Sequence, residues 1–208
     1  MEKFIIDLDD LLEGLGGKVK EDTKDLDSLM ELAQGLDRNI FIGDIDNIAD
    51  TVDAVIRFWN NYDNQRNIPI DEREPIKLYI DSYGGSLTEA FTICDSIKLS
   101  KTPIWTINIG TAYSGGFLIA ICGDRRYAYP HASYLFHEGA TGNSADANKF
   151  RNFADFYQIQ LEQLKDIILK HTSITSEKYK EKQRDDWWIT ADEAVDLKVC
   201  DVITEELI

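Results

Sequence analysis

The chain has 208 residues and a formal net charge of −16, from 38 acidic and 22 basic side chains. This length suits one domain with a substantial core, and the negative charge argues against nucleic acid or an anionic membrane as a partner, because phosphate groups would be repelled. The sequence shows neither an apolar run long enough to span a membrane nor a secretory signal, so we expect a cytoplasmic protein that binds no nucleic acid and no membrane.

Three cysteines, Cys94, Cys122 and Cys200, stand far apart among apolar residues. They form no CxxC pair and no cluster with the spacing of metal ligands. We therefore expect small buried thiols in a reducing compartment, with no metal ion and no cofactor.

Residues 1–38 are acidic, and their leucine and isoleucine residues recur at helical spacing. This acidic N-terminal arm is either a short amphipathic helix that docks on a neighbour or a solvated, partly disordered segment, and the pattern leaves both open. From residue 39 onward, short apolar strands alternate with amphipathic helices. The alternation predicts an α/β domain over residues 39–208.

Two successive strand–turn–helix units form the centre of the predicted domain. The turn of the first unit contains Gly84 and Gly85, and the second unit places Ser114 at the start of its helix. Because parallel strands present the turns that follow them at one edge of a sheet, we expect these two turns to be neighbours. The expected strands cover residues 76–81 and 103–109, and the expected helices cover residues 87–99 and 115–122.

Two short strands, at residues 125–129 and 133–136, are expected next, and the second leads to His137 at the same edge. A long helix follows over residues 144–171, with Ser144 as its candidate N-cap. Its aromatic and aliphatic stripe suits either the core or an oligomer contact. The remaining expected elements are a helix at residues 176–183, a capped helix that begins at Thr190, and a strand at residues 199–203.

Ser114 lies in the sequence AYSGG, which resembles the small-x-Ser-x-Gly turn that exposes a nucleophilic serine between a strand and a helix. Serine needs a neighbouring base, and the imidazole of His137 suits that role near neutral pH, provided that a carboxylate orients the ring. Each residue alone also has an ordinary structural interpretation. Serine beside glycine often caps a turn, and a lone histidine says little.

The Gly84-Gly85 pair allows positive φ angles and leaves backbone N–H groups uncovered at a helix start, so the turn could bind an anion. It matches neither the P-loop nor the GxGxxG pattern. A simple tight turn is the alternative, and the pair alone leaves both interpretations open.

Five short motifs follow one another along the chain: NIFI at 39–42, LYIDSYGG at 78–85, GTAYSGG at 110–116, YLFHE at 134–138 and RDDWWITADEAV at 184–195. In this order they resemble the family of Clp protease proteolytic subunits (ClpP), which are self-compartmentalised serine peptidases. The resemblance covers residues 39–203. It implies a ClpP/crotonase-like α/β fold of stacked β-α-β units, with the long helix projecting as a handle.

The resemblance also implies roles for individual residues. Ser114 is the implied nucleophile, His137 the general base and Asp186 the acid of the triad, with Asp185 as the alternative if the register slips by one residue.

Two further implications concern the backbone. The N–H groups of Gly85 and Gly115 are the implied oxyanion hole. The segment Gly139–Asn143 would form an extended edge that pairs with the backbone of a substrate.

The implied protein is a subunit of an ATP-dependent-type serine endopeptidase, which hydrolyses unfolded polypeptides inside an oligomeric ring chamber. Its implied partners are further copies of itself in stacked rings, expected as a tetradecamer, and an AAA+ unfoldase. Two alternatives stay open. One is a catalytically silent ClpP-like structural subunit of a mixed ring, and the other is a crotonase-type acyl-CoA enzyme, for which Glu89 would be the obvious carboxylate.

The chain departs from the usual residues of the family at three places. Tyr83 stands where proline is usual, Gly115 stands where a bulkier residue is usual, and Glu138-Gly139 replaces Gln-Pro. These departures suggest a divergent or phage-encoded member. A carboxylate at Glu138 would favour the protonated form of the neighbouring imidazole.

Overall fold

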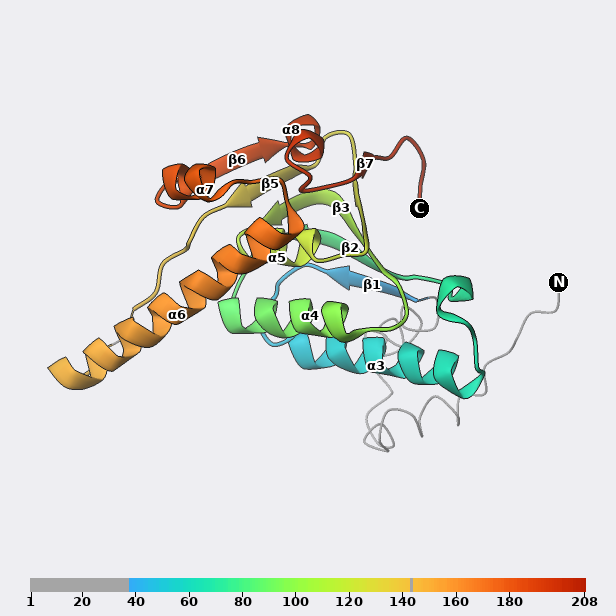
Figure 1. The fold of residues 1–208 in the computed structure, drawn as a ribbon, viewed down its shortest axis with the longest axis horizontal. Coiled ribbons are helices and arrows are strands. Elements are labelled where there is room, and N and C mark those ends of the chain that lie inside the picture. The colour runs from blue at the N-terminus through green and yellow to red at the C-terminus, as the bar shows by residue number, and fades with distance from the viewer. Residues whose placement is uncertain (1–37, 143) are drawn as a thin grey trace.

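The computed structural model describes residues 38–142 and 144–208 (Figure 1). The acidic arm predicted for residues 1–38 lies outside the described residues, apart from Arg38. The choice between a docked helix and a solvated arm therefore stays a prediction.

A seven-stranded sheet forms the centre of the domain. Five parallel strands follow the order β1-β2-β3-β4-β7, while β5 pairs with the far end of β3 in parallel and with β6 in antiparallel. The strands are β1 (Asn39–Ile42), β2 (Ile76–Ser82), β3 (Ile104–Tyr113), β4 (Arg125–Ala128), β5 (Ser133–Phe136), β6 (Trp187–Thr190) and β7 (Val202–Ile203).

Helices connect the parallel strands and pack on the sheet, with α3 and α4 side by side on one face (Figure 1). The long helix α6 runs outward from the domain and projects beyond the body of the molecule (Figure 1). This arrangement confirms the predicted α/β class, with stacked β-α-β units and a projecting helix. The helices within the described residues are α3 (Ala49–Gln65), η1 (Ile70–Glu72), α4 (Leu87–Leu99), α5 (Gly115–Ile121), α6 (Ala147–His171), α7 (Ser176–Lys182) and α8 (Ala191–Asp196).

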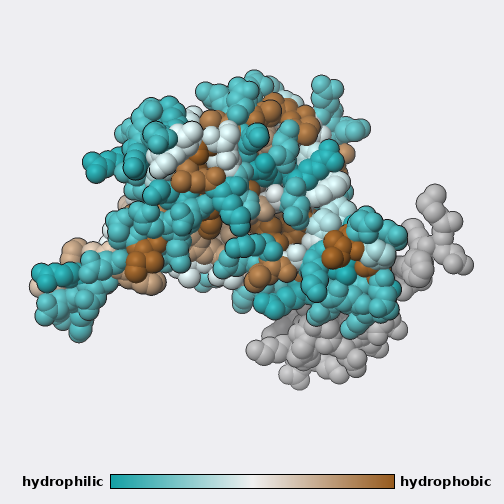
Figure 2. All heavy atoms as spheres, viewed as in Figure 1, coloured by the Kyte–Doolittle hydropathy of each residue, from teal (hydrophilic) through white to brown (hydrophobic). Residues whose placement is uncertain are grey.

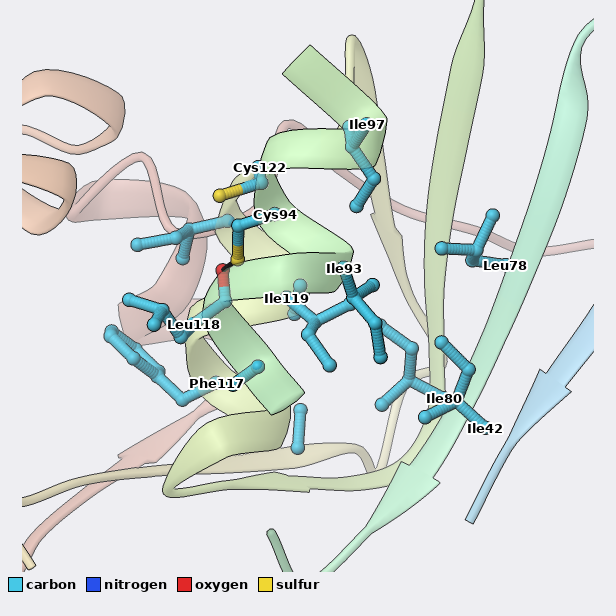
Figure 3. Close-up of a cluster of buried hydrophobic side chains, with 14 of the residues drawn as sticks. Ile42, Leu78, Ile80, Ile93, Cys94, Ile97, Phe117, Leu118, Ile119 and Cys122 are labelled. Carbon is cyan, nitrogen blue, oxygen red and sulfur yellow. Dashed lines mark hydrogen bonds between the residues drawn. The ribbon is translucent and has the colours of Figure 1, made fainter. Parts of the chain in front are cut away.

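The core lies between the sheet and the helices, and all seven residues of α5 are buried in it. Figure 3 shows isoleucine and leucine side chains of β1, β2 and α4 around this helix. The thiol of Cys94 donates a hydrogen bond to the carbonyl of Leu118 at 3.5 Å. All three cysteines are buried and free, as the sequence predicts. Because α5 is held on every side, the residue at its start has a fixed position.

The strand β3 is longer than predicted. The sequence indicates a turn at residues 110–113, but these residues continue the strand, because Thr111–Tyr113 pair with Ser133–Leu135 of β5. The carboxylate of Asp81 stabilises the extension by accepting the N–H and the hydroxyl of Thr111, each at 2.9 Å. Ser114 therefore follows directly from a strand that lies beside β5, the strand that leads to His137.

Two other boundaries differ from the predictions. The N-cap of α6 is Asp146 rather than Ser144, and its side chain accepts the N–H of Lys149 at 3.1 Å. The last strand is shorter than expected, because Val199 and Cys200 donate their N–H groups to the carbonyl of Ala194 in α8.

The stripe of α6 divides into two parts. Leu164 and Ile168 are buried in the core, whereas the outer part of the helix exposes Phe150, Phe156 and Ile159. Figure 2 accordingly shows hydrophobic spheres among hydrophilic ones along the projecting helix. The core interpretation therefore holds for Leu164 and Ile168, and the oligomer contact stays a prediction for the outer part of the helix.

A buried ion pair joins the start of β1 to α3. Arg38 donates to both carboxylate oxygens of Asp63, at 2.6 and 2.9 Å, and its guanidinium lies 4.2 Å from the ring centroid of Trp59. Thr102 donates its hydroxyl to the same carboxylate at 2.7 Å. Burial opposes ionisation of Asp63, but the hydrogen bonds from Arg38 and Thr102 prevail and lower its pKa. This pair lies at the start of β1, whereas Ser114 follows the end of the parallel strand β3, so the pair contributes to the scaffold.

Candidate active site

Ser114 has a strained backbone at the junction of β3 and α5. Its φ of 53° and ψ of −116° lie outside the regions that serine usually adopts. Two hydrogen bonds keep Ser114 in this conformation. The N–H of Ser114 donates to the carbonyl of Leu135 at 2.9 Å, and the carbonyl of Ser114 accepts the N–H of Leu118 at 3.3 Å. This is the geometry by which a strand-to-helix turn exposes a nucleophilic hydroxyl.

The Gly84-Gly85 turn lies directly against Ser114. Both glycines have positive φ angles, of 103° and 152°. A Cβ on Gly84 would lie 2.7 Å from the Cβ of Ser114 and 2.9 Å from the carbonyl oxygen of Tyr113. Only glycine allows this close approach, so the predicted proximity of the two turns is confirmed.

Gly115 is buried, and its surroundings explain why a small residue stands there. A Cβ on Gly115 would lie 3.1 Å from Cδ1 of Ile45 and 3.3 Å from the Cβ of Ala90. The Ile45 side chain therefore fills the space that a bulkier residue would need. Within the described ranges, the N–H groups of Gly85 and Gly115 donate to no other residue. Both donors are available to a ligand.

Asp46 is a residue of the groove that the sequence analysis missed. Its Oδ1 accepts the N–H of Ser86 at 2.7 Å and would lie 2.7 Å from a Cβ on Gly85, so it holds the glycine turn in place. Its own N–H donates to the side chain of Asp44 at 3.0 Å. The aspartates after β1 are a turn signal in the sequence, but a turn signal does not reveal a contact 40 residues away.

His137 and Asp186 form a hydrogen bond of 3.2 Å between Nδ1 and Oδ1. The antiparallel pairing of β5 with β6 sets this contact, because Phe136 pairs with Trp187 and the next residues outward are His137 and Asp186. The side chains are 31% and 59% exposed, respectively. In the part of the chain that the structure describes, the carboxylate of Asp185 makes no hydrogen bond or ion pair. Of the two candidate acids, Asp186 faces the histidine.

Ser114 and His137 line the same groove, of about 630 Å³. Among residues 38–142 and 144–208, no hydrogen bond joins the Ser114 hydroxyl to the imidazole. Catalytic hydrogen bonds of this kind often tighten only in the complex with substrate. The structure thus brings together the histidine and the acid, and Ser114 lines the same groove as the histidine.

One wall of the groove is apolar and comes from α5 and α6. It includes Leu118, Leu164, Phe153 and Tyr157. The contribution of α6 was not predicted, because the helical stripe alone does not show which of its residues face the serine. An apolar wall beside exposed backbone donors suits a polypeptide whose side chain enters the groove while its carbonyl meets the N–H groups.

A row of three aromatic rings begins at Tyr83, which lines the groove. Tyr83 contacts the ring of Tyr113 edge to face, with centroids 5.7 Å apart, and Tyr113 contacts Trp188 in the same way at 5.1 Å. The hydroxyl of Tyr113 is also hydrogen-bonded to that of Ser133 at 2.8 Å. Tyr83, which replaces the usual proline, is therefore part of a packed aromatic surface.

Neither a metal-binding cluster nor a membrane span is found in the described residues. No three His, Cys, Asp or Glu side chains come together there to hold a metal ion. No described helix is both long and apolar enough to cross a bilayer.

Comparison with known proteins identifies the family. Residues 37–206 match the family model of Clp protease, so the chain belongs to the Clp protease family. Among its relatives is the ATP-dependent Clp protease proteolytic subunit 1 of Shouchella clausii (strain KSM-K16), which is 32% identical over 171 residues. The match covers 80% of this chain and 84% of that relative. The resemblance predicted from the five motifs, the fold that it implies and the coarse prediction of a protease subunit are confirmed.

Proposed function

We propose that the protein is a serine endopeptidase with Ser114 as nucleophile, His137 as general base and Asp186 as the acid that orients the imidazole. The observation that carries this proposal is the hydrogen bond between His137 and Asp186, at the edge of the groove that also contains Ser114. The strained backbone of Ser114 supports it further, because strain of this kind is retained where the surrounding structure holds a functional side chain.

The reaction follows from these positions. Nε2 of His137 takes the proton of Ser114 Oγ as the oxygen attacks the peptide carbonyl, while Asp186 accepts the hydrogen bond from Nδ1–H and stabilises the imidazolium. The N–H groups of Gly85 and Gly115 donate to the oxyanion, and each such donor contributes about 3 kcal/mol. His137 then protonates the departing amine. In the second half of the reaction His137 takes a proton from water, the water oxygen attacks the acyl carbonyl, and His137 returns the proton to Oγ of Ser114 as the acid product leaves.

The proposed substrates are unfolded polypeptides that bind in an extended form along residues 139–143. The proposed setting is the cytoplasm, in stacked rings of identical subunits, a tetradecamer, with an AAA+ unfoldase as the partner that consumes ATP. The exposed apolar side chains of α6 support self-association, because an isolated subunit would leave them in water. No cofactor is required by the triad chemistry.

The contacts of Glu89 argue against the crotonase-type alternative. Its carboxylate accepts the N–H of Ala49 at 3.0 Å, at the start of α3, and Glu89 is not among the residues that line the groove. A carboxylate used in this way is not placed for acid–base chemistry on an acyl-CoA.

Labelling with a fluorophosphonate tests the proposal. The assembled protein should hydrolyse a fluorogenic peptide and take up one label per subunit, and peptide mass spectrometry should locate the label at Ser114. A label at another residue would contradict the proposed nucleophile. Assembled rings that show neither labelling nor hydrolysis would instead support the catalytically silent subunit, and calorimetric binding of coenzyme A would support the acyl-CoA enzyme.

Gly84→Ala should lower kcat/KM for peptide hydrolysis by about 10²-fold, the effect of misplacing a reacting group by about 1 Å. The reason is that the new Cβ would press on the Cβ of Ser114 and that alanine disfavours a φ of 103°. The matched control is Gly43→Ala, at a glycine of the same edge whose nearest contact for a Cβ is an ordinary 3.9 Å. Equal kinetics for the two variants would contradict the close approach.

A further inference from the structure

Tyr179 contacts the chain on both sides of His137. Its hydroxyl donates a hydrogen bond of 2.9 Å to Oε1 of Glu138, and its ring packs on that of Phe136 with centroids 5.3 Å apart. Residues two apart in an extended chain point to the same face, so Phe136 and Glu138 share one face and His137 points to the other. Tyr179 therefore contacts both residues that flank His137, Phe136 through its ring and Glu138 through its hydroxyl.

The same tyrosine is also connected to the segment that carries Asp186. Tyr179 is 1% exposed and lies on α7, the short helix that ends just before that segment. Its carbonyl accepts the N–H of Gln183 at 2.8 Å, and the carbonyl of Lys182 accepts the N–H of Asp185 at 3.0 Å. Tyr179 thus connects the two segments, with its side chain on the residues that flank the histidine and its backbone in the helix that leads to the acid.

A second tyrosine holds the backbone of the same residue. The hydroxyl of Tyr157, on α6, donates to the carbonyl oxygen of Glu138 at 3.0 Å. Glu138 is therefore attached to α7 through its carboxylate and to α6 through its backbone. These two contacts are independent, so they can be removed separately.

The charges around this arrangement favour the hydrogen bond. Burial raises the pKa of the Tyr179 hydroxyl, and the Glu138 carboxylate raises it further, so the hydroxyl stays protonated as a donor. Burial and the same carboxylate raise the pKa of Tyr157. The other charged groups that face this region are Glu162 of α6, Asp186 beside the imidazole, and Lys178 and Lys182 of α7, which lie over the ring of Trp187.

We propose that Tyr179 and Glu138 are positioning residues for His137, an inference that rests on the proposed peptidase function. The Tyr179 hydroxyl keeps the Glu138 carboxylate turned toward α7, so that Asp186 is the carboxylate that meets the imidazole. The same hydrogen bond fixes the backbone that carries His137. The carboxylate next to the histidine is thereby bound to α7, and the imidazole is bound to Asp186.

Tyr179→Phe is the test, because it removes one hydroxyl and keeps the ring that packs on Phe136. The kcat/KM should fall by up to about 10²-fold. The acid limb of its pH profile should move to higher pH by about one unit, since the released Glu138 carboxylate favours the imidazolium. The double variant Tyr179→Phe/Glu138→Gln has no such carboxylate, so its acid limb should return to the wild-type position.

Tyr157→Phe is the matched control. It also removes one tyrosine hydroxyl beside Glu138, but it leaves the carboxylate bonded to Tyr179. Its activity should fall without movement of the acid limb. The proposal would be overturned if the acid limb of the pH profile of Tyr179→Phe coincided with that of the wild type. It would also be overturned if the acid limb of the double variant stayed at the higher pH.

If circular dichroism shows that Tyr179→Phe does not fold, the comparison of Glu138→Gln with Glu138→Ala decides. Glutamine still offers an oxygen to Tyr179 and should retain much more activity than alanine. Equal activity of the two would reject the positioning role. An inactive, unlabelled wild type would reject the peptidase function itself, whereas an active wild type with unshifted variants would reject only the roles of Tyr179 and Glu138.

Discussion

Ser114→Ala should lower kcat for peptide hydrolysis by about 10⁶-fold, the loss typical of removing the nucleophile from a serine triad. The change removes only Oγ, and without it no acyl-enzyme can form. Alanine keeps the Cβ that contacts the Gly84 turn, and both backbone hydrogen bonds of residue 114 remain. We therefore expect the variant to fold and assemble like the wild type, as native mass spectrometry and thermal unfolding would show.

The matched control is Ser173→Ala. Ser173 also combines a backbone hydrogen bond with an Oγ contact, to the carbonyl of Asp196 at 3.3 Å, but it lies outside the groove. Its kinetics should remain those of the wild type, with at most a small loss of stability. Residual hydrolysis in Ser114→Ala that a fluorophosphonate still inhibits would assign the nucleophile to another residue.

Asp186→Asn should lower kcat by about 10⁴-fold. The amide has nearly the size of the carboxylate but can present an N–H to Nδ1 of His137, which favours the wrong tautomer and gives no support to the imidazolium. The hydrogen bond of 3.2 Å defines which nitrogen is affected. Single-turnover acylation kinetics should show the loss in the chemical step, with little change in peptide binding.

Asp185→Asn is the control for this prediction, since it removes the same charge from the neighbouring position. The Asp185 N–H bonds to Lys182, and its carboxylate has no partner among the described residues, so kcat should stay close to that of the wild type. The reverse result, with Asp185→Asn impaired and Asp186→Asn active, would assign the role of the acid to Asp185.

Much of the fold could be predicted because its signals are local. The strands around Ile80 and Ile107 are contiguous apolar runs, and the helix Leu87–Leu99 buries residues at helical spacing, so both patterns appear directly in the sequence. The order of the motifs then indicated the family. Since the turns after parallel strands meet at one edge, the proximity of Gly84 and Ser114 could be predicted as well.

Other elements could not be predicted, because distant residues decide them. The extension of β3 through Gly110 depends on pairing with β5, and β6 is a four-residue strand whose partner lies about 50 positions earlier. The contact of Asp46 with Ser86 spans 40 residues. Local propensity favours a turn at Gly110, where pairing with β5 overrides it, and no local pattern shows the distant partner of β6 or of Asp46.

The sequence by itself determined the α/β class, the Clp protease resemblance and the candidates Ser114, His137 and Asp186 or Asp185. Only the tertiary structure decided which aspartate faces the histidine, how Ile45 leaves room for nothing larger than Gly115, and where the Glu138 carboxylate points. The physical reason is that residue types and spacing follow from local periodicity and backbone preferences, whereas the direction of a side chain depends on the partners that packing brings to it. Tyr179 is 41 residues from Glu138 in the chain, and no local pattern connects them.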